Sequence, residues 1–273
     1  MSFITVNQSP LLPGVSPVEI HYREYGNASG TPLVFLHGGW GYEVYPFDRQ
    51  VETFGKDCRI VIPDRTGYGR SMRINSLPVD FHRRAAREMM SFLDALDMEG
   101  AILWGHSDGA VIAMMMALQS PHRFAGIILE AFHYYRDKPG SKGFFETMSE
   151  SPEMLGGRVT KVLAEDHGED YWKELIVING LAWLGIAEQS ARPKQDLYDG
   201  KLRELSVPTL FLHGSDDPRT EPGELDAVRE ELKRAEMRII QGGGHAPHSQ
   251  KSVADECNRI AAEFMRGLNR PRS

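Results

Sequence analysis

The feature that most constrains this chain is a serine between two glycines, at the junction of an apolar run and a helix-like segment. Residues 105–109 read Gly-His-Ser-Asp-Gly, the run at 101–104 before them is apolar, and small apolar residues follow at 110–118. These patterns predict a buried strand, a sharp turn and a helix packed on all sides. Glycines permit a tight turn that holds the serine hydroxyl clear of the sheet. The competing interpretation is a serine that only caps a helix.

Apolar runs of strand length alternate with helix-like patterns along most of the chain. Strands covered on both faces are continuously apolar, and their alternation with helices predicts an α/β fold, a mostly parallel sheet flanked by helices. Residues 18–25 instead alternate apolar and polar residues, which predicts an edge-type strand. The predicted strands of the sheet are residues 33–36, 59–63, 101–104, 126–129, 207–212 and 237–241, and further predicted helices are residues 81–96, 223–235 and 253–268.

The alternation stops between residues 132 and 205, where no buried-strand run occurs. A helical segment inserted into an α/β sheet is the simplest organisation. We therefore expect a core of residues 1–131 and 206–273, with residues 132–205 as a helical cap inserted after the strand that follows the serine-bearing helix. Short helical patterns within the expected cap occur at residues 143–149, 158–165 and 171–184.

Charge and composition exclude several classes of protein. The net charge of −7 comes from 31 basic and 38 acidic residues mixed along the chain, so no basic stripe is available to bind a nucleic acid. The N-terminus lacks the features of a signal peptide, and the longest apolar run, residues 110–118, is too short to cross a membrane. Cys58 and Cys257, the two cysteines, suggest no disulfide framework or metal site, and we expect no cofactor. A cytoplasmic location follows as the expectation, with residues 266–273 as a frayed tail.

Ser107 needs two partners before its hydroxyl can act as a nucleophile. A histidine must accept the proton, and a carboxylate must fix the tautomer of that histidine. Parallel strands deliver the loops after them to one edge of a sheet, so the candidates are residues that follow strand ends. Asp217 follows one predicted strand and His245 follows another. Their order along the chain, Ser, Asp, His, is the order of a known hydrolase triad.

Each partner has a competitor nearby. Asp216 adjoins Asp217, and Glu130 directly follows another predicted strand. We interpret Glu130 as a polar residue at the cap junction. His248 is the second candidate base, but the Gly-Gly-Gly run directly before His245 fits a loop that approaches the site closely.

Five short motifs stand in order along the chain: His37-Gly38-Gly39, Asp64-x-x-Gly67-x-Gly69-x-Ser71, Gly105-x-Ser107-x-Gly109, Gly214-x-x-Asp217 and Gly244-His245. Each motif is short, but in this order and spacing they resemble the α/β-hydrolase family over nearly the whole chain. The resemblance implies an α/β-hydrolase fold and a triad of Ser107, Asp217 and His245, with Asp216 as a turn or cap residue.

Acyl transfer also builds negative charge on the carbonyl oxygen of the substrate, which calls for preorganised N–H donors. Asp108 follows the serine and opens a helix, so its backbone N–H is one predicted donor of this oxyanion hole. The resemblance implies a second donor in the residue after His-Gly, which is Gly39, with Trp40 as the next candidate. His37 and His106 are interpreted as structural.

The predicted substrate contacts are Trp40, Asp108 and Tyr134, because aromatic residues concentrate in the expected cap and favour an apolar or aromatic substrate group. Asp108 has two interpretations, stabilisation of the helix N-terminus or an anchor for a cationic substrate group. Its Gly-x-Ser-Asp-Gly pattern is similar to that of biphenyl-hydrolase-like, valacyclovir-hydrolase-type enzymes, which cleave amino-acid esters. Residues 168–172 and Phe264 are also similar to theirs.

The leading hypothesis is a cofactor-free serine hydrolase that acts on a small-molecule carboxylic ester through an acyl-enzyme. The same triad would also serve hydrolysis of a C–C bond in a ring-fission product, or of an amide. A hypothesis of another class is a ligand-binding protein without catalysis, in which ligand affinity would not respond to Ser107→Ala. The sequence sets no oligomeric state.

Overall fold

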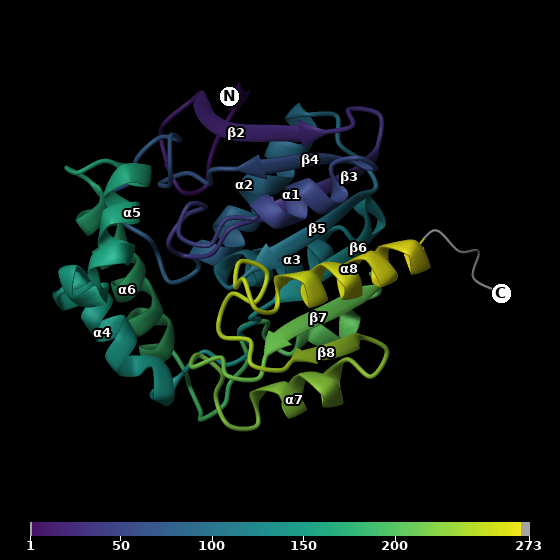
Figure 1. The fold of residues 1–273 in the computed structure, drawn as a ribbon. Helices are drawn as coiled ribbons and strands as arrows, with labels where there is room; N and C mark the ends of the chain where they lie inside the picture. The colour runs from purple at the N-terminus through teal and green to yellow at the C-terminus, as the bar shows by residue number, and fades with distance from the viewer. Residues whose placement is uncertain (1, 269–273) are drawn as a thin grey trace.

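An eight-stranded sheet runs through the centre of the computed structural model, which describes residues 2–268 (Figure 1). The strand order is β1-β2-β4-β3-β5-β6-β7-β8; β2 is antiparallel to both of its neighbours, and the remaining pairs are parallel. The predicted α/β architecture is therefore confirmed. The strands are β1 Ser2–Val6, β2 Val18–Gly26, β3 Thr31–Leu36, β4 Cys58–Pro63, β5 Ala101–His106, β6 Phe124–Glu130, β7 Thr209–Gly214 and β8 Glu236–Ile240.

The prediction of an edge strand at residues 18–25 was wrong. β2 pairs on one side with β4 and on the other with β1, whose register runs from Ser2 opposite Tyr22 to Val6 opposite Val18. β1 occupies that edge of the sheet. Its five residues show no clear run or alternation of apolar side chains, so backbone pairing to β2, rather than a hydrophobic pattern, defines it.

Two hydrophobic cores lie on the two faces of the sheet. In β5, Leu103 belongs to one core, whereas Ile102 and Trp104 belong to the other. Helices α2 and α3 cover the first face, and α1 and α8 cover the second. Burial on both faces explains why the central strands are continuously apolar. The helices are α1 Asp48–Phe54, α2 Phe81–Ala95, α3 Asp108–Gln119, α4 Lys142–Glu150, α5 Gly157–His167, α6 Trp172–Glu188, α7 Glu224–Glu231 and α8 Ala254–Leu268.

Helix α1 was not predicted. Residues 266–268, which were expected to begin a frayed tail, are the last three residues of helix α8, and residues 269–273 lie outside the described residues. No helix within residues 2–268 combines the length and the apolar character needed to cross a bilayer.

Helices α4, α5 and α6 stand together beside one end of the sheet (Figure 1). We call residues 132–205, which contain them, the α4–α6 segment. A buried ion pair ties the start of this segment to α7, because the Lys138 ammonium donates to both carboxylate oxygens of Glu224 at 2.7 and 2.6 Å. Each side chain is only 1% exposed. Glu224 also accepts the backbone N–H groups of Tyr134 and Tyr135, so one carboxylate fixes the path of the chain as it leaves the sheet.

Candidate active site

Ser107 sits at the sharp turn between β5 and α3 with φ 55° and ψ −120°, a conformation that non-glycine residues seldom adopt. The turn is held by a hydrogen bond from the Ser107 N–H to the Glu130 carbonyl at 2.9 Å. A Cβ on Gly105 would lie 2.2 Å from the Gly109 carbonyl oxygen, and one on Gly109 would lie 2.0 Å from that of Leu36. Neither position has room for a side chain, which is why glycines flank the serine.

The structure brings Ser107, Asp217 and His245 together. The Ser107 Oγ lies 3.0 Å from His245 Nε2, and His245 Nδ1 lies 2.9 and 3.1 Å from the two Asp217 oxygens. Burial opposes ionisation of Asp217, but the nearby His245 outweighs it and holds the pKa of this carboxyl well below its usual range. Asp217 is therefore a carboxylate that accepts the Nδ1–H of His245, which leaves Nε2 free to accept the serine proton.

The competing residues are engaged elsewhere. Asp216 is exposed and accepts a hydrogen bond from Ser215. Glu130 lies at the end of β6, but its side chain is buried in the core rather than placed as a polar group of the junction, which corrects our interpretation. It accepts hydrogen bonds from His248 Nδ1 at 2.8 Å and Trp104 Nε1 at 2.9 Å.

A second histidine, His133, reaches the same serine and was missed by the sequence analysis. Its Nε2 lies 3.3 Å from the Ser107 Oγ, and burial lowers its pKa well below the usual range, so it is neutral. Its position three residues beyond Glu130, the last residue of β6, was the available signal. Unlike His245, His133 has no carboxylate hydrogen-bonded to it within residues 2–268.

The backbone around Gly39 is oriented by a buried arginine. Arg65 Nη2 donates to the carbonyl oxygens of Gly38 at 2.9 Å and His37 at 3.2 Å. In a trans peptide the C=O and the following N–H point in opposite directions, so this bond turns the N–H of Gly39 away from Arg65. Asp108 is the first residue of α3, and its N–H has no acceptor within the helix. Gly39 and Asp108 both line the pocket that contains Ser107.

We expect Arg65→Met to lower kcat about 10- to 100-fold with little change in KM, because the Gly38–Gly39 peptide loses the contact that orients it, and loss of one oxyanion donor outright costs 10²–10³ in kcat. Steady-state kinetics on an ester would measure this. Arg65→Lys keeps one donor for the Gly38 carbonyl and should recover part of kcat. A purely structural Arg65 would instead give folded variants whose lower thermal midpoint accompanies an unchanged kcat.

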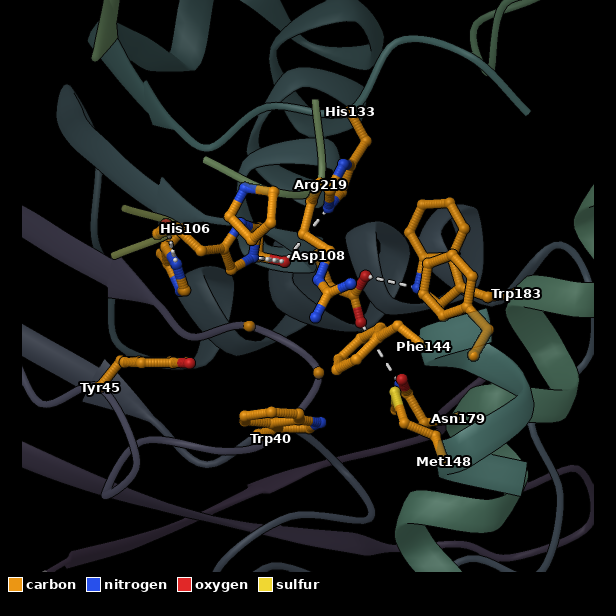
Figure 2. Close-up of a pocket in the computed structure, with 16 residues that line it drawn as sticks. Trp40, Tyr45, His106, Asp108, His133, Phe144, Met148, Asn179, Trp183 and Arg219 are labelled. Atoms are coloured by element: carbon orange, nitrogen blue, oxygen red, sulfur yellow. Dashed lines mark hydrogen bonds between the residues drawn. The ribbon is translucent and has the colours of Figure 1, made fainter. Parts of the chain in front are cut away.

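The pocket beside Ser107 has a volume of about 260 Å³ and lies between the strand ends and helices α4 and α6 (Figure 2). Trp40 and Asp108 line it as predicted. Tyr134 does not: its N–H is bonded to Glu224, and its ring lies against Tyr198 at 6.4 Å between centroids. The backbone after β6 runs in a direction that places His133, the residue before Tyr134, in the pocket instead.

Asp108 is 1% exposed, and its carboxylate accepts three hydrogen bonds. His82 Nε2 donates to one oxygen at 3.1 Å. Figure 2 shows the other two bonds, from Trp183 Nε1 to the same oxygen at 3.1 Å and from Asn179 Nδ2 to the other oxygen at 3.3 Å. Burial opposes ionisation, but the bond from His82 and the further contacts lower the pKa to about 2. Asp108 therefore carries a negative charge in the pocket wall and joins α3 to α2 and α6.

Helix α5 rests on the loop that contains Gly39. His167 Nε2 lies 3.1 Å from the Trp40 carbonyl, and its Nδ1 accepts the Gly69 N–H at 2.9 Å. The neighbouring Asp166 is packed against Gly41, where a Cβ would lie 2.8 Å from its Oδ2. Burial, with the like charge of Asp64, raises the pKa of Asp166 to about 6.

Asp166 should therefore make the fold less stable as the pH rises. Its pKa in the folded state lies above the unfolded value of about 3.9, so the penalty is small below that value and complete above the folded pKa. We expect Asp166→Asn to raise the free energy of unfolding by about 2 kcal/mol more at about pH 8 than at about pH 4. Urea denaturation at the two pH values measures this, with the exposed Glu165→Gln on the same helix as control. An effect that is equal at both pH values would contradict it.

Within residues 2–268, no cluster of three or more His, Cys, Asp or Glu side chains is arranged to hold a metal ion.

Comparison with known proteins identifies the family to which this chain belongs. The sequence profile of the alpha/beta hydrolase family matches residues 33–259. The chain belongs to the alpha/beta hydrolase family. The resemblance drawn from five motifs is thus confirmed, and with it the fold and the assignment as a hydrolase.

Individual relatives of this alpha/beta hydrolase are distant but span most of the chain. Serine hydrolase BPHL of Homo sapiens is 25% identical over 254 residues, which cover 92% of this chain and 84% of that protein. The 2-hydroxy-6-oxononadienedioate/2-hydroxy-6-oxononatrienedioate hydrolase of Paraburkholderia xenovorans (strain LB400) is 26% identical over 291 residues, covering 92% of each. Among solved structures, a thermophilic esterase from Thermogutta terrifontis superposes with a TM-score of 0.74 at 21% identity and covers 99% of this chain and 100% of its own.

Proposed function

We propose that this alpha/beta hydrolase is a serine hydrolase that cleaves a small carboxylic ester. The observation that carries the proposal is the chain of contacts from Ser107 Oγ to His245 Nε2 at 3.0 Å and from His245 Nδ1 to Asp217 at 2.9 Å. A serine hydroxyl bonded to a histidine, itself bonded to a buried carboxylate, is the arrangement that activates a serine for acyl transfer.

In the proposed reaction, His245 takes the proton of Ser107 as Oγ attacks the ester carbonyl carbon. The N–H groups of Gly39 and Asp108 stabilise the oxyanion. The intermediate collapses to an acyl-enzyme as His245 returns the proton to the departing alcohol. Water, deprotonated by His245, then attacks the acyl carbon and releases the acid and the free serine.

The pocket supports a small substrate, because its volume of about 260 Å³ falls below the usual range for drug-sized ligands. We propose Trp40 and Asp108 as substrate contacts. The charge of Asp108 would favour an amino-acid ester, as the similarity to serine hydrolase BPHL also suggests. C–C bond hydrolysis is the second candidate, because the relative from Paraburkholderia xenovorans is named for a dienedioate substrate.

We also propose that residues 132–205 form a cap over this site, with residues 1–131 and 206–273 as the core. Phe144 and Met148 of α4 and Trp183 of α6 line the pocket, so this segment supplies a wall that the sheet does not.

The test is hydrolysis of p-nitrophenyl esters from acetate to octanoate, and of one aminoacyl ester, by the wild type and by Ser107→Ala. We expect activity in the wild type, a fall of at least about 10⁴-fold in Ser107→Ala, and no change in Ser91→Ala, a control on the surface helix α2. Equal activity in wild type and Ser107→Ala would overturn the assignment of the nucleophile. If both are inactive on every ester, ester hydrolysis is excluded, and a vinylogous diketone then tests C–C cleavage.

A further inference from the structure

Arg219 brings an unpaired positive charge into the pocket. Its guanidinium Cζ lies 3.2 Å from the centroid of the Phe144 ring, and Figure 2 shows the side chain extending over that ring. Within residues 2–268 this guanidinium forms no hydrogen bond and no ion pair; only the backbone N–H of Arg219 is bonded, to Asp217. Its five N–H donors are therefore available to a ligand.

Asp217 does not neutralise this arginine. Its carboxylate oxygens are occupied by His245 Nδ1 and by the backbone N–H of Arg219, and no contact within ion-pair distance joins the two side chains. An arginine confined beside an aromatic ring keeps its charge, although burial lowers the pKa of Arg219. A half-buried cation without a charged partner is unfavourable, and an anionic group on a ligand would supply that partner.

Tyr45 adds a neutral donor to the lining of the same pocket. Its ring stacks on Trp40 at 5.9 Å, and its hydroxyl forms no hydrogen bond within residues 2–268. Burial raises the pKa of Tyr45, and the positive charge of Arg219 opposes the rise. The phenol stays protonated and can donate.

We propose that Arg219, with the hydroxyl of Tyr45, binds a carboxylate on the substrate, so that the ester cleaved at Ser107 is one that carries a second, ionised carboxyl group. The planar guanidinium can meet a carboxylate with two parallel hydrogen bonds, a geometry that a lysine cannot reproduce. Asp108 and Arg219 then contribute charges of opposite sign to the lining of the pocket. The proposal rests on ester hydrolysis as the proposed function and names its substrate class.

The experiment compares matched pairs of esters in which a methyl group replaces the carboxylate. Ethyl hydrogen glutarate is paired with ethyl pentanoate, and ethyl hydrogen adipate with ethyl hexanoate. Acetoxyacetate is paired with ethyl acetate, to place the charge on the alcohol side. The wild type, Arg219→Gln, Arg219→Lys and Tyr45→Phe are followed by proton release. The control is Arg192→Gln, which removes the same charge from an exposed arginine outside the pocket.

We expect the ratio of kcat/KM for the charged ester over its neutral match to fall about 10- to 100-fold in Arg219→Gln for at least one pair, as expected for loss of hydrogen bonds between charged groups. Arg219→Lys should recover part of the ratio, Tyr45→Phe should lower it less, and Arg192→Gln should leave it unchanged. A ratio that Arg219→Gln leaves unchanged for every pair overturns the proposal while ester hydrolysis stands.

Binding provides a measurement that needs no turnover. Calorimetric titration of Ser107→Ala with ethyl hydrogen glutarate should show binding that Ser107→Ala/Arg219→Gln loses. If the wild type cleaves no ester, the proposed function fails, and this titration still decides whether Arg219 holds a carboxylate. Equal affinity in the two proteins overturns the proposal.

Discussion

Asp217→Asn is expected to lower kcat for an ester substrate about 10⁴-fold, with the fold intact. An amide can donate a hydrogen bond to His245 Nδ1, which places the imidazole proton on Nε2, the atom that must accept the proton of Ser107. The amide also brings no charge to stabilise the imidazolium. Steady-state kinetics, with circular dichroism to check the fold, measures the effect.

Asp216→Asn is the matched control, since it makes the same change one residue earlier on an exposed side chain. It should retain wild-type kcat. A large loss in Asp216→Asn together with a small loss in Asp217→Asn would reverse the assignment of the acid.

Glu224→Gln is expected to lower the free energy of unfolding by about 3–5 kcal/mol, the usual result of breaking a buried ion pair. The amide oxygen can still accept the N–H groups of Tyr134 and Tyr135, but the amide nitrogen cannot accept the N–H of Glu221. The loss therefore combines one backbone hydrogen bond with the unpaired charge left on Lys138, whose side chain is 1% exposed. Urea denaturation monitored by fluorescence measures it.

Two further variants test whether the loss of stability in Glu224→Gln comes from the unpaired charge of Lys138 and from its burial. Lys138→Met/Glu224→Gln should recover most of the stability, because no uncompensated charge remains. Glu231→Gln breaks the pair with Arg203, whose side chain is 74% exposed, and should change the free energy by less than about 1 kcal/mol. Equal losses in Glu224→Gln and Glu231→Gln would contradict the assigned role of burial.

The parts of this fold that could be predicted are the elements that have a recognisable local sequence pattern. Strands β3 to β7 are largely apolar on both faces, and Ser107, Asp217 and His245 each follow a strand end, so sequence alone indicated where they would meet. Strand β1 was missed because it is held by pairing to β2, a long-range contact without a local pattern.

The contents of the pocket were less predictable because they depend on side-chain direction in irregular backbone. His133 and Tyr134 are adjacent, yet only His133 faces Ser107. Arg219 follows Asp217 by two positions, and its lack of a partner is visible only once every neighbouring carboxylate has been placed. Asp108 could be predicted to lie at the site, but not its bonds to His82 and Trp183, which come from two other helices.

The backbone of Ser107 sets a limit on how this protein can be improved for heat resistance. A residue held at φ 55° and ψ −120° stores about 1–3 kcal/mol of strain, and glycine would relax it. Selection for thermal stability alone would therefore favour glycine at position 107, and the selected variants would lack the serine that we propose as the nucleophile. Variants of this protein therefore have to be screened for catalytic activity and thermal stability together, because a substitution at residue 107 that raises stability is expected to abolish activity.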